Sequence, residues 1–360
     1  MVAAVLEKAP PEAWGPSERV TPIRKPEGFT PAVQRWSFQL PGQAMRVAFF
    51  GVQGPDEGAL NESGFLGWVL KSLADHPNGP SVYDNARYTD NAGQLTYVTT
   101  AYWVDEERWD SWSSDPTATA WWEAPERLSG PVGSWREILH VPAERQESIY
   151  WIDYPAGLMR SSDVSVYPTP YCGYYGAMRD RLPLSASDPL DSPVEKLSPA
   201  PNRDSRGQRW RVHPPANLAV IRSANTWGRM DAEQRADYEQ KLRVPLYTGM
   251  DYLDQNAVPT GCASLRMLTT TGTDWSLEPE QHALGYFLSL RHMESWAEGH
   301  STHAAIFKAA ITRYKQYGST NQLRTWHEVF VLPEHGHLFE YTNCHPTTGL
   351  LPWFDAEQIA

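Results

Sequence analysis

The feature that most constrains the fold is the order of strand-like and helix-like segments along the chain. In the first half, a buried strand over 46–53 is followed by an amphipathic helix over 60–76 and a strand over 95–104 that a shorter strand precedes. A second helix begins with acidic residues at 105, and another strand spans 134–141. Period-two and period-3.6 apolar patterns distinguish these strands from these helices. The first half therefore reads strand, helix, strand, strand, helix, strand.

The second half of the chain repeats this order after a Pro- and Ser-rich stretch at 182–208. Its predicted elements are a strand over 217–223, a helix within 231–255, strands over 262–271 and 283–290, a helix containing 296–307, and closing strands over 323–332 and 337–343. The order is that of a ferredoxin-like unit. We expect an α+β fold with an N-terminal arm (1–40), a first ferredoxin-like unit (41–181), the connection (182–208) and a second unit (209–360).

A weak sequence similarity between the two halves also indicates duplication. The stretches 103–109 and 290–296 begin and end at equivalent strand-to-helix junctions, and "DPTATAWW" and "HSTHAAIF" follow them. This alignment places His303 where the first half has Ala118. One copy would then carry a ligand at a position where the other has a methyl group.

Charge and composition exclude several function classes. The chain has 43 acidic and 31 basic residues, a net charge of −12, so the attraction that drives binding to nucleic acid or anionic lipid is missing. No run of 18 apolar residues and no signal peptide is found, which predicts a cytoplasmic protein. Three scattered cysteines form no CxxC or CxxCH pattern, and GxSxG, Walker A and GxGxxG motifs are absent. A small-molecule partner fits best.

Histidines in "WAEGHSTHAAIF" and "TWHEV" are the candidate functional residues. A helix over 296–314 would place six residues on one face, namely Trp296, His300, His303, Phe307, Ala310 and Tyr314. The two histidines are either hydrogen-bonded core residues or ligands, and zinc lacks a third ligand at a recognisable spacing. On the strand, His327 shares a face with Val329 and Val331, where it either satisfies a local hydrogen bond or titrates in a pocket.

Several longer stretches resemble the haem-containing aldoxime dehydratases. They occur in the family's order and cover most of the chain beyond the arm: "GVQ" (51–53), "GYYGAMRDRLP" (173–183), "NLAVIRSANTW" (217–227), "GMDYLDQNAVPTGCASLR" (249–266), "WAEGHSTHAAIF" (296–307), "WHEV" (326–329) and "FEYTNCHPTTGLL" (339–351).

The resemblance implies a dimeric α+β barrel type of haem protein that holds haem b noncovalently, ferrous in its active form, and converts R–CH=N–OH to a nitrile and water. It assigns His303 as the axial ligand of the iron and His327 as the catalytic acid and base. It assigns Ser223 to the substrate hydroxyl, and Arg181 and Glu147 to the charge around the catalytic histidine. A homodimer is expected, because ferredoxin-like units leave sheet faces that need covering.

Some points stay open at this stage. Arg179 rivals Arg181 for the functional arginine, with a surface salt bridge as its alternative role. Gly299 and Ser301 depart from the family's pattern, and a glycine inside a helix costs up to about 1 kcal/mol, which could weaken haem binding. Peroxide or chlorite chemistry on a related barrel, and a haem carrier or gas sensor, are the competing functions.

Overall fold

The end of the predicted N-terminal arm forms a strand. A computed structural model describes residues 20–203 and 205–360, so the first part of the arm lies outside the described residues. Within the rest, β1 (Arg35–Gln39) pairs antiparallel with β7 (Ser165–Thr169) in a two-stranded sheet. This strand forms because Phe38 alternates with polar neighbours and is buried in the main core.

Four antiparallel strands form the sheet of the first half, in the order β5-β2-β4-β3. They are β2 (Ala44–Gly54), β3 (Val82–Thr89), β4 (Leu95–Trp103) and β5 (Gly133–Pro142). The strands predicted over 46–53, 95–104 and 134–141 are confirmed, and β3 is the expected shorter strand. If β2, β3, β4 and β5 are numbered one to four along the chain, their order across the sheet is four, one, three, two.

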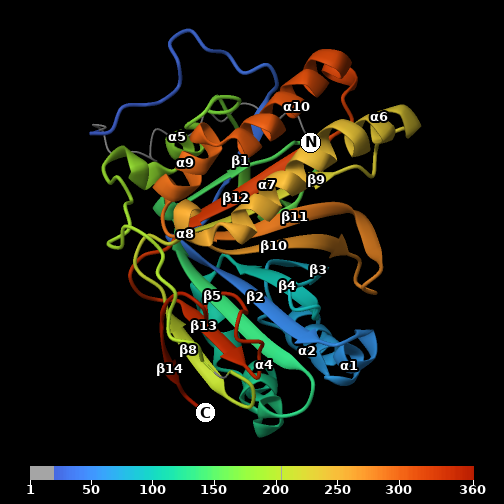
Figure 1. Cartoon of the computed structure of the whole chain (residues 1–360), viewed down its shortest axis with the longest axis vertical. Coiled ribbons are helices and arrows are strands. Elements are labelled where there is room, and N and C mark those ends of the chain that lie inside the picture. The colour runs from blue at the N-terminus through green and yellow to red at the C-terminus, as the bar shows by residue number, and fades with distance from the viewer. Residues whose placement is uncertain (1–19, 204) are drawn as a thin grey trace.

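Helices cover the outer face of these four strands (Figure 1). They are α1 (Glu57–Glu62), α2 (Phe65–Val69), the π-helical η1 (Leu70–Ala74), α3 (Glu106–Ser113) and α4 (Pro116–Glu123). The helix predicted over 60–76 is interrupted at Gly64, whose φ of +81° suits glycine. Asp105 and Asp115 begin α3 and α4, because each carboxylate accepts a hydrogen bond from a backbone N–H of the first turn.

The second half repeats the arrangement, with strands in the order β10-β11-β9-β12. The strands are β9 (Ala219–Thr226), β10 (Cys262–Thr271), β11 (Leu277–Phe287) and β12 (Arg324–Val331). The helices are α6 (Ala232–Asp237), the π-helical η6 (Tyr238–Arg243), α7 (Val244–Gln255), α8 (Ala257–Thr260), α9 (Leu290–Gly299) and α10 (Ser301–Tyr317). By place in this half the order is two, three, one, four, which is the same order read from the other side.

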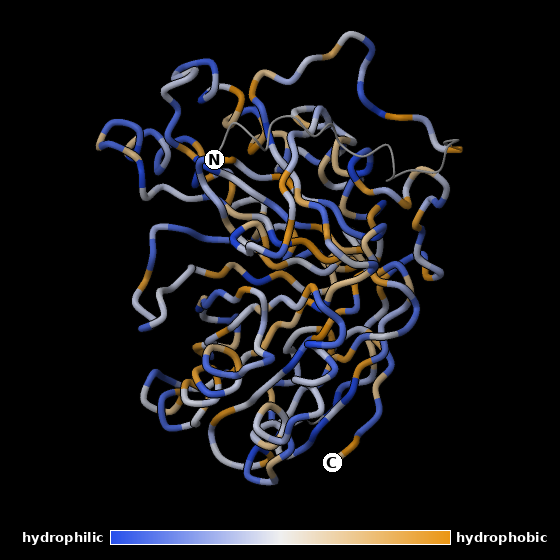
Figure 2. The backbone as a smooth tube through the Cα atoms, turned by 180° about the vertical axis from the view of Figure 1, so that it is seen from behind, coloured by the Kyte–Doolittle hydropathy of each residue, from blue (hydrophilic) through white to orange (hydrophobic). Residues whose placement is uncertain are grey.

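A pairing between β3 and β10 joins the two halves into one twelve-stranded sheet. The halves lie one above the other in Figure 1, with the helices of each half on its outer side. The largest apolar cluster draws on both halves: Val47 and Leu139 come from the first, and Val220 and Phe330 from the second. The tube in Figure 2 carries much apolar colour along this middle region. Each half-sheet therefore covers the inner face of the other within a single chain.

The two halves of the chain exchange strands at the ends of the sheet. From the first half, β6 (Gln146–Ile149) pairs with β12, and from the second half, β13 (Leu338–Thr342) pairs with β5 and with β8 (Arg209–His213). The expectation that 337–343 closes the sheet of the second half is wrong. A cross-strand ion-pair ladder explains the pairing, since Glu340 accepts from Arg136 at 2.6 Å and from Arg211 at 2.8 Å.

The outermost strand of the sheet at this end is β14 (Asp355–Gln358), which pairs with β8. At the other end, next to β6, lies the short helix α5 (Ala177–Arg181) of the segment that precedes the predicted connection. Among the described residues, no helix has both the length and the apolar character needed to cross a membrane.

Candidate active site

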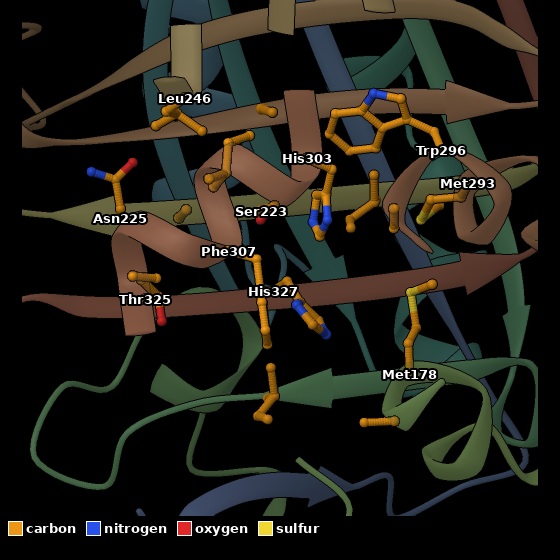
Figure 3. Close-up of a pocket in the computed structure, with 18 of the residues that line it drawn as sticks. Met178, Ser223, Asn225, Leu246, Met293, Trp296, His303, Phe307, Thr325 and His327 are labelled. Atoms are coloured by element: carbon orange, nitrogen blue, oxygen red, sulfur yellow. The ribbon is translucent and has the colours of Figure 1, made fainter. Parts of the chain in front are cut away.

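A cavity of about 460 Å³ lies between the outer face of the second half-sheet and its helices. Helices α7, α9 and α10 form one wall, strands β9 to β12 form the opposite wall, and the segment from 173 to 181, including α5, closes one side. Its lining is mostly apolar, with Leu246, Met293 and Met178 around a few polar groups (Figure 3). Volume and lining are those of a site for an organic ligand.

His303 enters the cavity from the helical wall. Its ring lies 4.8 Å from that of Trp296, centroid to centroid, at 67° between the planes. Nδ1 of His303 is buried without a hydrogen bond, and burial lowers the pKa of the imidazole, an effect that the backbone carbonyl of Ala297 only partly offsets. The neutral imidazole, which is the form that binds metals, is therefore favoured.

The helix predicted over 296–314 is broken at His300, so the expected common face of His300 and His303 is wrong. His300 has extended backbone angles, φ −99° and ψ 137°, and its Nδ1 accepts a hydrogen bond from the first turn of α10. The imidazole stacks on Tyr252 of α7, with 3.9 Å between ring centroids. Gly299 is the last residue of α9, and so the expected cost of a glycine in a helix interior does not arise.

His327 and Ser223 enter from the sheet wall, directly opposite each other on β12 and β9. The predicted alternation is confirmed, since His327 lies on the same face as Val329, which packs in the outer cluster of this half. Trp326 and Glu328 point the other way, into the core between the two half-sheets.

Arg181 and Glu147 converge on Nε2 of His327. Arg181 donates from Nε to Glu147 Oε2 at 2.6 Å, and its Nη2 lies 2.9 Å from His327 Nε2. Glu147 Oε1 lies 2.9 Å from the same nitrogen. Glu147 is only 1% exposed, so it does not lie on a solvated face. Burial alone would raise its pKa, but the charges of Arg181 and His327 lower it below the ordinary value.

This arrangement can satisfy His327 Nε2 in either protonation state. An arginine guanidinium only donates, so Arg181 can pair with Nε2 when that nitrogen is bare, and a protonated Nε2 can donate to Glu147. Within the described part of the chain, Nδ1 of His327 forms no hydrogen bond. It is the nitrogen left free for a ligand in the cavity.

Arg179, the rival of Arg181, has a different partner. Its guanidinium donates to both carboxylate oxygens of Glu294 on α9, at 2.7 to 3.1 Å, and both side chains are buried. Arg179 does form a salt bridge, as its alternative role predicted, but the pair is buried and does not lie on the surface. The pair fastens α5 to α9 at the side of the cavity.

Other cavity residues were not singled out in the sequence. Tyr175 stacks obliquely on Phe307 at 4.9 Å and lies 6.1 Å from the ring of His303, and Met178 follows it in the same segment. Asn225 and Thr325 lie on the sheet wall (Figure 3). The stretch 173–183 carried a family signal, but irregular backbone has no periodicity to show which side chains face inward.

The residues present fit a haem. The inward residues Ile306, Phe307 and Ala310 of α10 are only half-buried, because they face the cavity and not a filled core. A large apolar group would cover them, and the imidazole of His303, which enters the cavity, would hold the iron of a haem. Among the described residues, no three His, Cys, Asp or Glu side chains converge to hold a metal ion by themselves.

Comparisons with known proteins agree with this site. The family described as haem-containing dehydratase matches residues 48–350. Phenylacetaldoxime dehydratase of Bacillus sp. (strain OxB-1) is 32% identical over 93% of this chain and 95% of its own length. Aliphatic aldoxime dehydratase of Pseudomonas chlororaphis is 31% identical over 91% and 93%.

Solved structures give the same result. The crystal structure of an aldoxime dehydratase in complex with butyraldoxime superposes with a TM-score of 0.84 and 30% identity, covering 96% of each chain. Another aldoxime dehydratase structure gives 0.83 over 92% of this chain and 95% of that one. Sequence, fold and cavity thus lead to one conclusion: this chain belongs to the haem-containing aldoxime dehydratases, whose cofactor is haem.

Proposed function

We propose that this chain is a lyase that dehydrates an aldoxime, R–CH=N–OH, to a nitrile and water at a haem bound through His303. The observation that supports it best is the cavity with His303 on the helical wall and with His327 and Ser223 on the sheet wall. One wall offers the imidazole of His303, which would hold the haem iron, and the other offers a proton donor and a hydroxyl. No oxidant is consumed, because the reaction only moves two protons and breaks the N–O bond.

Ferrous haem would supply an iron that binds the oxime nitrogen and polarises the N–O bond. The leaving group is hydroxide, which leaves easily only after it receives a proton. Ser223 holds the oxime hydroxyl by a hydrogen bond, and protonated His327 donates to the oxygen from Nδ1. Neutral His327 then takes the proton from the carbon, so that the histidine ends as it began. One histidine can serve twice because its ordinary pKa, about 6.5, lies near neutral pH.

Glu147 and Arg181 maintain the two states of His327. The Glu147 carboxylate lies 2.9 Å from Nε2, where it stabilises the imidazolium that donates. Nε2 keeps its proton, and Glu147 stays its acceptor, when Nδ1 has given up its proton; the guanidinium of Arg181 holds that carboxylate in place through its 2.6 Å hydrogen bond to Oε2. Because burial and ion pairing fix both groups, the histidine changes charge with little movement of its neighbours.

An anaerobic optical experiment tests this function. The haem-loaded protein is reduced with dithionite, mixed with phenylacetaldoxime or butyraldoxime, and sampled for nitrile by chromatography. We expect the ferrous Soret band to shift when oxime is added and to return as nitrile accumulates. Haem binding without nitrile from either oxime would overturn the proposal and favour peroxidase or sensor activity, and failure to bind haem would overturn the role of His303.

We also propose that the two halves are tandem ferredoxin-like units that pair within one chain as an α+β barrel. The equal strand orders of the halves support this, and the boundaries proposed remain 41–181 and 209–360, with strands exchanged at the sheet ends. Buried, unpaired Cys172, Cys262 and Cys344 support a reducing, cytoplasmic location. We further propose a homodimer that uses the sheet edge at β14, and light scattering at the mass of one chain would overturn it.

A further inference from the structure

The break between α9 and α10 brings three side chains into a hydrogen-bonded chain beside His303. Nε1 of Trp296 lies 3.1 Å from Thr302 Oγ1, and that oxygen lies 2.8 Å from Nδ1 of His300. The backbone N–H of Thr302 donates to the same Nδ1 at 3.3 Å. An unbroken helix would not direct the His300 side chain back to residue 302, so this contact depends on the extended backbone at His300.

The chemistry of the groups fixes which one donates in each hydrogen bond among Trp296, Thr302 and His300. An indole N–H only donates, so Thr302 Oγ1 accepts from Trp296. Nδ1 of His300 already accepts from the backbone N–H of Thr302 and is therefore bare, so the hydroxyl proton of Thr302 is donated to it. The hydroxyl is used as acceptor on one side and as donor on the other.

Trp296 and His300, the two ends of this hydrogen-bonded series, both lie against α7. The His300 ring stacks on Tyr252, and the ring of Trp296 lies beside Gly249, where an added Cβ would be in ordinary van der Waals contact with it at 3.5 Å. The indole also packs against the imidazole of His303 in a T-shaped arrangement. Trp296 thus transmits the position of α7 and of the Thr302 hydroxyl to the ring that faces the cavity.

We propose that Thr302 is a positioning residue for the haem ligand: its hydroxyl, bonded to Trp296 and His300, holds the indole that sets the orientation of the His303 imidazole. This inference rests on the proposed role of His303 as the axial ligand. The proposal gives the helix break at His300 a role. His300 does not line the cavity, and it caps the first turn of α10 instead.

Three threonine variants test it: Thr302→Val removes the hydroxyl, Thr302→Ser keeps it, and Thr312→Val is the matched control. Thr312 is exposed on the same helix, and within the described residues its hydroxyl bonds only to the carbonyl of Lys308. In the haem-loaded proteins we measure the iron–histidine stretching band of the ferrous form by resonance Raman, and the rate of haem transfer to apomyoglobin. Thr302→Val should shift the band and release haem about tenfold faster, as loss of groups that orient a metal ligand does. Thr302→Ser and Thr312→Val should match the unmodified protein.

Trp296→Phe removes the indole N–H that donates to Thr302. It should shift the iron–histidine stretching band in the same direction as Thr302→Val. This second variant keeps the test decisive if Thr302→Val folds poorly. An unchanged band and release rate in Thr302→Val or in Trp296→Phe would overturn the positioning role. His303→Ala separates this failure from that of the proposed function: it should lose the band, and retention of the band would remove His303 as the ligand whatever the threonine variants show.

Discussion

The outer faces of the two half-sheets differ far more than their strand orders do. On the first half, the face beneath the helices is filled by aromatic rings: Phe50 packs against Trp68, Trp112 and Trp122, with centroids 4.9 to 5.9 Å apart. On the second half, the same kind of face is hollow and carries His303, His327 and Ser223. One scaffold thus serves in one copy as a packed core and in the other as a binding site.

Corresponding residues show how the hollow face arises. The fourth strands read "SWREILHVP" (134–142) and "TWHEVFVLP" (325–333), which align Arg136 with His327. Across the sheet, Arg136 lies opposite Phe50, and His327 lies opposite Ser223. The first half has a phenylalanine where the second has a serine. Removing a large ring opens space, and a titratable histidine next to that space supplies chemistry.

The inner faces, in contrast, have stayed alike. Glu137 of the first half accepts a hydrogen bond from Tyr286 of the second at 2.5 Å, and Glu328 of the second half accepts one from Tyr102 of the first. Both carboxylates are fully buried and each is ion-paired with an arginine. Because removing one partner of a buried ion pair is strongly destabilising, each inner face needs both members of its pair.

The largest expected effect comes from the residue that most separates the two outer faces. His327→Ala should lower turnover by roughly 10² to 10⁴, the usual contribution of a positioned acid or base, and should leave haem binding intact. Steady-state nitrile formation and the Soret absorbance per chain measure the two quantities. Arg136→Ala, at the corresponding place in the first half, is the matched control.

The control should affect stability and leave turnover per bound haem unchanged, since Arg136 pairs with Glu340 and Glu123 far from the cavity. Turnover of His327→Ala equal to that of the unmodified protein would contradict the assignment of the catalytic histidine.

A matched pair of enlargements tests whether one face is packed and the other hollow. Ala118→Phe, on α4, adds a ring where the alanine is 1% exposed, and overpacking should cost about 1 to 3 kcal/mol of unfolding free energy. Ala310→Phe adds the same ring on α10 at the edge of the cavity, where it should fit at little cost and exclude haem instead. Urea unfolding and haem titration measure both effects. Equal destabilisation by the two substitutions would mean that the second face is as tightly packed as the first.

Much of the fold could be predicted from the sequence, because strands such as 46–53 and 134–141 have strong local patterns that tertiary contacts reinforce. The exchange of β6 and β13 could not be predicted, since pairing depends on long-range partners such as Arg136 and Glu340. The broken helix was missed because the apolar spacing continues through His300, and only the cap at its Nδ1 marks the interruption. The repeat at 134–142 and 325–333 was present in the sequence and would have given the better alignment of the halves.

The candidate site was predicted residue by residue from a family resemblance, and the structure brings Arg181, Glu147 and His327 together as expected. Periodicity alone could not have done this, because Glu147 lies on β6 and Arg181 on α5, both from the first half of the chain. A side chain contributed across such a distance leaves no local pattern. Their roles in catalysis remain proposals, and His327→Ala tests that of the histidine.

The smallest expected effect concerns the inner faces, at a position where they differ. Tyr286 of β11 and Tyr102 of β4 occupy corresponding positions. Four residues before each tyrosine, β11 has His282 and β4 has Val98, and both of these side chains are buried. Burial, assisted by the charge of Arg222, lowers the pKa of His282 to about 3. The folded protein therefore binds fewer protons than the unfolded chain, in which the pKa is about 6.5. The stability from this group is complete above pH 6.5 and falls as the pH drops toward 3.

His282→Val gives the second half the residue of the first and should remove this dependence. Between pH 7 and pH 5.5, the unmodified protein should lose about 1 kcal/mol more unfolding free energy than the variant. Urea unfolding of both proteins at the two pH values measures the difference, in which the contributions of all other titrating groups cancel. Equal losses would mean that the pKa of His282 is the same in the folded and in the unfolded protein, and a smaller loss in the unmodified protein would mean that the charge of Asp84 keeps His282 protonated in the fold.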